Sequence, residues 1–188
     1  MNSIIEQNDK EDFYIRLYFN TEKRGGYQLA GIKRAFLDFS RTLSKKDERP
    51  SNIKKSEDFI LSKLSELLIS RMKSQDEFDV FHKKICKGLI ENWKELKIGQ
   101  AQKWVNMTLK YWLLFGESRI SGIENNAKYF HIPIDRIIQN KFFGKNLSPW
   151  SQIDIYEDYF IYQKKFREKY PNKIPIVIEF KEFNKLYK

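Results

Sequence analysis

Apolar side chains recur every three or four residues along most of this chain, which is the spacing of an α-helix. The clearest case is residues 27–44, where one helical face carries Leu29, Ile32, Phe36, Phe39 and Leu43. The same pattern over residues 57–73 and 74–96 predicts two helices that form an antiparallel hairpin. Further helices are expected over residues 98–115, 121–130, 133–143 and 154–169. Because 5 prolines and 8 glycines are few for 188 residues, helix is the default structure.

Two segments fit more than one structure. Residues 11–20 are rich in β-branched and aromatic side chains and could form a strand or a helix. Residues 174–187 are β-branched like a strand, yet their apolar positions also fit one helix face. The sequence thus predicts a single mainly α domain over residues 1–188: a bundle of about seven helices. It allows at most a small peripheral strand element from residues 11–18 and 174–181. Residues 45–56 are expected to be a flexible charged loop, and residues 171–188 a C-terminal tail.

The expected helix over residues 98–115 is apolar on most sides, which predicts that it is central and buried. Lys103, Asn106 and Lys110 share one stripe of it, and Gln102 lies beside that stripe. Since unpaired buried charge is costly, we interpret these residues as an anion site in which lysines supply charge and amides supply directed donors. The alternative is that this stripe is the solvent-facing side of the helix.

A second basic stripe is formed by Arg34, Arg41 and Lys45. Asp38 lies between the two arginines at helical spacing, so ion pairs within the helix could account for much of it. Trp150 lies in the expected loop 144–152. It could stack on a base or fold back onto the helix that follows.

The charge of the chain favours a polyanionic partner. Lys and Arg number 35 against 25 Asp and Glu, which gives a formal net charge of +10. A surplus of this size attracts nucleic acid through long-range electrostatics and counterion release. The longest apolar run is far shorter than a membrane span, and no secretory signal is visible, so we expect a cytoplasmic protein without membrane contact. We expect no cofactor.

The chain holds one cysteine, Cys86, and two histidines, His82 and His131. These counts exclude zinc sites built on four cysteines, on two cysteines and two histidines, or on three histidines. His82 falls on an apolar helix face and is expected to be a hydrogen-bonded core residue. His131 lies in a turn before Pro133 and is the better candidate of the two for a general acid or base, although a cap or turn role is the preferred interpretation.

One short pattern resembles the PD-(D/E)xK nucleases, in which an aspartate, a glutamate and a lysine gather around Mg²⁺. It consists of Pro133-Ile134-Asp135 and Glu179-Phe180-Lys181. The chain departs from the nuclease pattern because Asp135 is expected on a helix and little of the required sheet is visible. We therefore expect that Asp135, Glu179 and Lys181 do not assemble and that Glu179 lies near solvent.

Three functions follow from these observations. The leading expectation is a binding protein without catalysis that contacts nucleic acid or another polyanion through Gln102, Lys103, Asn106, Lys110, Arg34, Arg41, Lys45 and Trp150. The second is a metal-dependent nuclease or another enzyme of nucleic-acid processing that uses Asp135, Glu179 and Lys181, or His131. The third is a protein–protein interaction component of a larger bacterial system.

Overall fold

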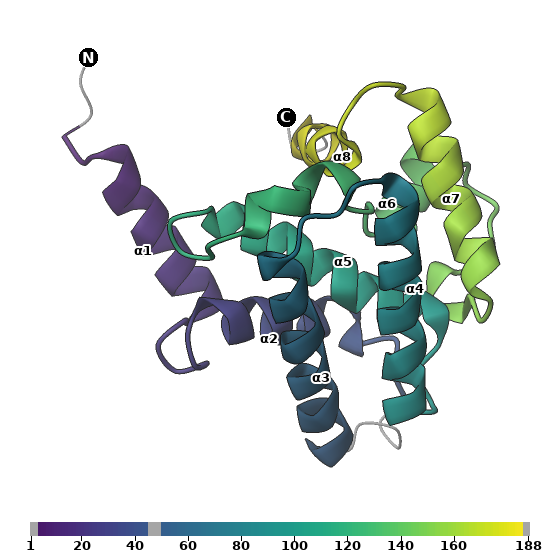
Figure 1. The fold of residues 1–188 in the computed structure, drawn as a ribbon, viewed down its shortest axis with the longest axis horizontal. Coiled ribbons are helices and arrows are strands. Elements are labelled where there is room, and N and C mark those ends of the chain that lie inside the picture. The colour runs from purple at the N-terminus through teal and green to yellow at the C-terminus, as the bar shows by residue number, and fades with distance from the viewer. Residues whose placement is uncertain (1–3, 45–49, 186–188) are drawn as a thin grey trace.

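The computed structural model describes residues 4–44 and 50–185, and within these ranges every regular element is a helix (Figure 1). The mainly α fold is therefore confirmed. The α-helices are α1 (Gln7–Phe19), α2 (Tyr27–Ser40), α3 (Pro50–Ile69), α4 (Gln75–Asn92), α5 (Ile98–Phe115), α6 (Arg136–Phe142), α7 (Tyr156–Lys169) and α8 (Pro175–Asn184). Two 3₁₀ helices complete the described elements, η1 (Ile123–Tyr129) and η2 (Trp150–Gln152).

Helix α5 lies at the centre of the molecule, as its apolar sequence predicts. Helices α2 and α4 pack against it from different sides, and almost all of its side chains are buried. Trp104 and Trp112 are fully buried, and their indole N–H groups donate to the carbonyls of Ile32 and Gln28 on α2. Gly31 allows this close contact, because a Cβ there would lie 2.8 Å from the ring of Trp112.

The two segments left open between strand and helix are helical, because residues 11–18 and 174–181 lie largely in α1 and α8. Two other expectations about local structure are wrong. Of the expected loop 45–56, residues 50–56 instead lie in α3, which begins at Pro50, and residues 45–49 lie outside the described residues. Residue Pro133 does not start a helix either. The chain stays extended until Asp135, whose carboxylate accepts from the backbone N–H of Ile138 and caps α6.

A chain of buried hydrogen bonds ties α4, α5 and α7 together. The acceptor-only carboxylate of Asp79 lies 2.7 Å from Nε2 of His131, which must therefore donate to it. The other ring nitrogen, Nδ1, then accepts from Tyr159, whose oxygen accepts from the amide of Asn106. The Asn106 carbonyl accepts from Nε2 of His82, and His82 accepts from a second tyrosine at its Nδ1. Each N–H and O–H donor in this chain thus has an acceptor, and the chain as a whole fixes the relative positions of three helices.

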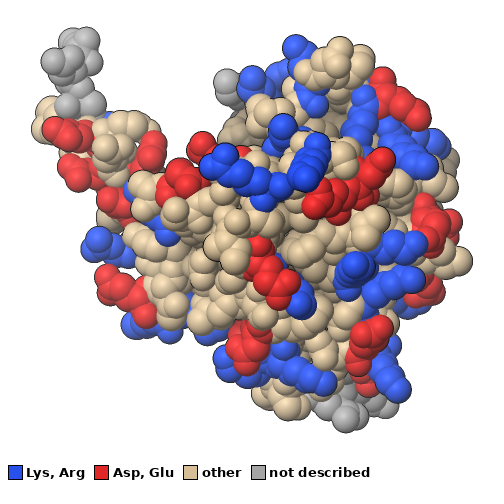
Figure 2. All heavy atoms as spheres, viewed as in Figure 1, with Lys and Arg blue, Asp and Glu red and all other residues tan. Residues whose placement is uncertain are grey.

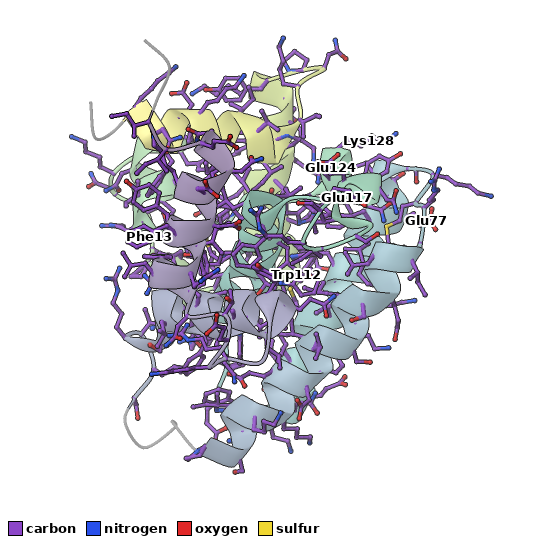
Figure 3. All side chains as sticks on the ribbon, turned by 90° about the vertical axis from the view of Figure 1, so that its left-hand side faces the viewer. Phe13, Glu77, Trp112, Glu117, Glu124 and Lys128 are labelled. Atoms are coloured by element: carbon purple, nitrogen blue, oxygen red, sulfur yellow. The ribbon has the colours of Figure 1, made fainter. Side chains whose placement is uncertain are left out.

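Helix α1 stands away from the rest of the molecule (Figures 1 and 2). Its inner side touches the body through Ile15 and the buried Phe19, and Asp12 accepts a 2.6 Å hydrogen bond from Arg119. Phe13 lies on α1 at the edge of the molecule, whereas Trp112 lies inside it (Figure 3). None of the described helices combines the length and the apolarity that a membrane span requires.

Candidate binding cleft

A cleft of about 440 Å³ lies where α1, α2, α5, α6 and α8 meet. It brings together residues of both basic stripes predicted from the sequence, because Arg34 on α2 and Arg41 just after it line the cleft with Lys103 and Lys110 on α5. Three carboxylates also line it, so four positive and three negative side chains share the site. We call this site the charged cleft. Its lining is Tyr18, Arg34, Leu37, Asp38, Arg41, Lys103, Met107, Lys110, Tyr111, Leu114, Asp135, Ile137, Glu179, Phe180, Phe183 and Asn184.

Both lysines of α5 are ion-paired within the molecule. Lys103 Nζ lies 2.6 Å from a carboxylate oxygen of Asp135, and Lys110 Nζ lies 2.9 Å from Glu179 Oε1. Lys103 and Lys110 are 4% and 7% exposed, so the stripe that they form is not the solvent-facing side of α5. The ammonium group of Lys110 also lies over the rings of Phe180 and Phe183, at 5.5 and 4.8 Å from their centres. Most of the charge that the stripe could offer an anion is therefore already compensated.

The two arginines of the charged cleft, Arg34 and Arg41, differ in their contacts. The guanidinium of Arg34 stacks 4.1 Å above the ring of Tyr18 and approaches Asp38 at 3.8 Å. Asp38 also accepts a 2.5 Å hydrogen bond from the Tyr111 hydroxyl, and burial raises the pKa of both groups. Arg41 is exposed and makes no ion pair with any residue that the structure describes. It is the cation at this site with the greatest freedom to meet a ligand.

An apolar surface continues the charged cleft towards α1 and α8. Leu114 lines the charged cleft and two neighbouring hollows, of about 300 and 410 Å³. The hollow on the α8 side is almost entirely apolar, and Tyr14, Ile15 and Tyr18 of α1 border the other. We call this surface the apolar trough, made of Tyr14, Ile15, Leu113, Leu114, Ile176, Val177 and Phe180. In Figure 2 an open notch separates the projecting α1 from the end of the molecule that carries α8.

The other predicted anion-site residues lie elsewhere. Gln102 and Asn106 have no exposed surface, and their amides bond to the backbone and side chains of the core. Trp150 is buried in η2 beside the start of α5, where a Cβ on Gly99 would collide with its carbonyl oxygen. Lys45 lies outside the described residues.

The nuclease-like residues come only partly together. Asp135 and Glu179 both line the charged cleft, but each faces its own lysine. The expectation that Glu179 lies near solvent is wrong, because it is 1% exposed. Because residues 175–184 are helical, Lys181 points to the apolar hollow instead. Among the described residues, no group of three or more His, Cys, Asp or Glu side chains is arranged to hold a metal ion.

The candidate acid–base histidine is also enclosed. His131 has no exposed surface, and burial lowers its pKa to about 4, against the opposing effect of Asp79. His82 is a hydrogen-bonded core residue, as expected. Both histidines therefore position helices and are neutral near pH 7.

Sequence reasoning missed the apolar half of this site. Leu114 belongs to the same periodic pattern as its buried neighbours on α5, and nothing local marks it as 43% exposed. The signal that could have found the trough is the excess of apolar residues on α1 and α8, two segments left undecided between strand and helix. Comparison with known proteins adds no constraint, because no protein family, curated protein or solved structure matches the chain.

Proposed function

We propose that this protein is a binding protein that docks an amphipathic helix of another protein chain in the apolar trough. The charged cleft lies at one side of the trough and would orient the bound helix. A helix laid into an apolar groove is a recurring mode of recognition, with affinity from apolar anchors and specificity from flanking charges.

The observation that carries this proposal is the exposure of Leu114. It lies on the central helix, where most other side chains are buried, yet it is 43% exposed. Val177 on α8 is 42% exposed, and Tyr14 on α1 is 65% exposed. Contiguous exposed apolar surface of this kind is typical of interaction sites.

The charges around the trough favour an acidic partner helix. The four cations and three carboxylates of the charged cleft leave one net positive charge. Lys181 adds a positive charge beside the apolar hollow, and Glu11 adds a negative charge beside the hollow on the α1 side. Neither Arg41 nor Lys181 makes an ion pair with a described residue. A helix with leucines on one side and carboxylates on its flanks would satisfy both features.

Polyanion binding, the leading expectation from the sequence, has less support in this geometry. Lys103 and Lys110 each already face a carboxylate, and Gln102 and Asn106 are enclosed in the core. The exposed Arg41 and the net charge of +10 still favour some attraction for nucleic acid. Oligonucleotide binding is therefore a separate outcome of the test.

The test is a titration with a fluorescently labelled helical peptide that carries leucines on one face and glutamates on the other. We expect saturable binding, with an affinity at least about tenfold lower for Leu114→Glu. The matched control is Ile69→Glu, since Ile69 is 88% exposed on α3 and lines none of these hollows. A peptide with lysines in place of the glutamates should bind more weakly than the acidic one.

Equal binding by Leu114→Glu and Ile69→Glu would contradict the proposal. A DNA or RNA oligonucleotide that binds in preference to the peptide, with a steep salt dependence that Arg41→Glu reduces, would replace it with polyanion binding.

A further inference from the structure

We infer that the helix that fits the apolar trough is α1 of a second copy of this chain, so that each copy docks its α1 in the trough of the other around a two-fold axis. This inference rests on the proposed function, because it identifies the partner of the same trough. It follows from the surface of α1, from the charges along it, and from its place beside the trough.

Helix α1 has more apolar surface than its own body covers. Ile15 and Phe19 face the body, whereas Phe13 and Leu17 lie one turn apart on a different side of the helix. These two side chains are 62% and 71% exposed. A helix that is apolar on two sides and packed on one of them leaves the second side for another contact.

The charges of α1 are opposite to those of the molecule as a whole. Glu6, Asp9, Glu11 and Asp12 concentrate in its first half, on a chain with a net charge of +10. Asp12 is used internally by Arg119, while Glu6 and Asp9 make no ion pair with a described residue. In Figure 2 the red acidic atoms gather towards the free end of this arm.

The trough has the complementary character. Leu114 shares the lining of the charged cleft with Arg41 and the lining of the apolar hollow with Lys181, and neither cation makes an ion pair with a described carboxylate. Glu11 of the resident α1 lines the hollow on the other side. Phe13 and Leu17 of one protomer can lie against Leu114 and Val177 of the other, with the acidic half of α1 near those cations. This pairs apolar with apolar and negative with positive surface in a single contact.

Under two-fold symmetry, the α1 helix of each copy lies in the trough of the other copy. Because α1 forms one wall of the trough, the incoming helix would lie beside the resident α1, and both contacts would form together. A contact of this kind is self-complementary and closes at two subunits. Each aromatic side chain that it covers contributes about 150–250 Å² when fully buried, and the contact occurs twice.

The test is the oligomeric state of the full chain, measured by analytical ultracentrifugation over a wide concentration range. We expect a monomer–dimer equilibrium, with Leu17→Glu and Val177→Glu each weakening dimerisation at least about tenfold. Ile69→Glu serves as the matched control and should leave the dimer unchanged. Circular dichroism establishes that each variant remains folded.

Mixing the two variants gives the sharper result. Leu17→Glu retains an intact trough and Val177→Glu retains an intact α1 strip, so one of the two reciprocal contacts survives in a mixed pair. We expect a mixed dimer to form at concentrations where each variant alone is monomeric. A dimer that neither variant weakens, or a mixture that stays monomeric, would overturn the inference. A monomeric wild type that still binds the acidic peptide through Leu114 would overturn it too, while leaving the proposed function intact.

Discussion

Lys110 and Glu179 form a nearly buried ion pair that joins the central helix α5 to α8, with Nζ 2.9 Å from Oε1 and 2.8 Å from Oε2. Only 7% of the lysine and 1% of the glutamate surface is exposed. Burial raises the pKa of Glu179, and the charge of Lys110 opposes this rise. The pair therefore holds α8 beside the trough, and each buried charge is compensated by the other.

Removing one partner of this pair should destabilise the fold strongly. Lys110→Met leaves a buried carboxylate without its cation, and such losses cost about 3–5 kcal/mol. The double variant Lys110→Met/Glu179→Leu should be more stable than Lys110→Met alone, because no uncompensated charge remains. Urea denaturation measures both effects. The matched control is Lys54→Met in the exposed Lys54–Asp58 pair, which should be nearly neutral. Additive losses in the double variant would show that the two groups act independently.

The buried histidines make stability depend on pH. The pKa of His131 is about 4 in the folded state and near 6.5 when exposed, and the pKa of His82 is also lowered by burial. Below pH 6.5 the unfolded chain binds protons that the folded chain does not, so stability present above pH 6.5 is lost as the pH falls towards 4. For His131 alone the loss between pH 7 and pH 5 is about 2 kcal/mol.

The check is urea denaturation at both pH values, with His131→Gln for comparison. This variant cannot titrate in the window, so its free energy of unfolding should fall less between pH 7 and pH 5. An equal fall in wild type and variant would mean that His131 is not the group responsible.

Trp112→Ala should remove a fully buried ring and a hydrogen bond to α2, at a cost of about 3–5 kcal/mol. The melting temperature of the purified variant reports this loss. A natural comparison is Leu113→Ala on the same helix, where the side chain is only partly buried and a smaller loss is expected. A melting temperature within a few degrees of wild type for Trp112→Ala would contradict the central position of α5.

Incubation of DNA and RNA with the purified protein and Mg²⁺ or Mn²⁺ tests the nuclease resemblance. We expect no cleavage, because Asp135 and Glu179 each face a lysine and Lys181 points to a different hollow. Reproducible cleavage that Asp135→Ala abolishes would make the protein an enzyme. The control is Asp58→Ala, which removes an exposed carboxylate that does not line the charged cleft.

The sequence predicted the helices well wherever one period dominated. Residues 98–115 are apolar almost all round, and this pattern has few solutions other than a buried central helix. The apolar positions of residues 11–20 and 174–187 fitted both a strand and a helix. Only packing against α5 and its neighbours decides between the two structures. Pro133 was read as a helix start on local grounds, but the buried hydrogen bonds of the neighbouring backbone keep that segment extended.

Several residues of the candidate site could be predicted from the sequence, but which of them lie next to each other could not. Lys103, Lys110, Asp135 and Glu179 were all singled out, yet for different functions. Their pairing joins positions 32 and 69 residues apart, which no local pattern encodes. The exposure of Leu114 depends on how far α1 and α8 stand apart, and this is a property of the tertiary structure.

The most direct test of the docking surface is to locate a bound helix by NMR. Backbone amide shifts of the isotope-labelled protein would be followed while the acidic amphipathic peptide is added. We expect the largest changes on Leu113, Leu114, Val177 and Phe180, with Ile69 and the rest of α3 unaffected. Changes centred on another face, or no changes at peptide concentrations that saturate binding, would contradict it.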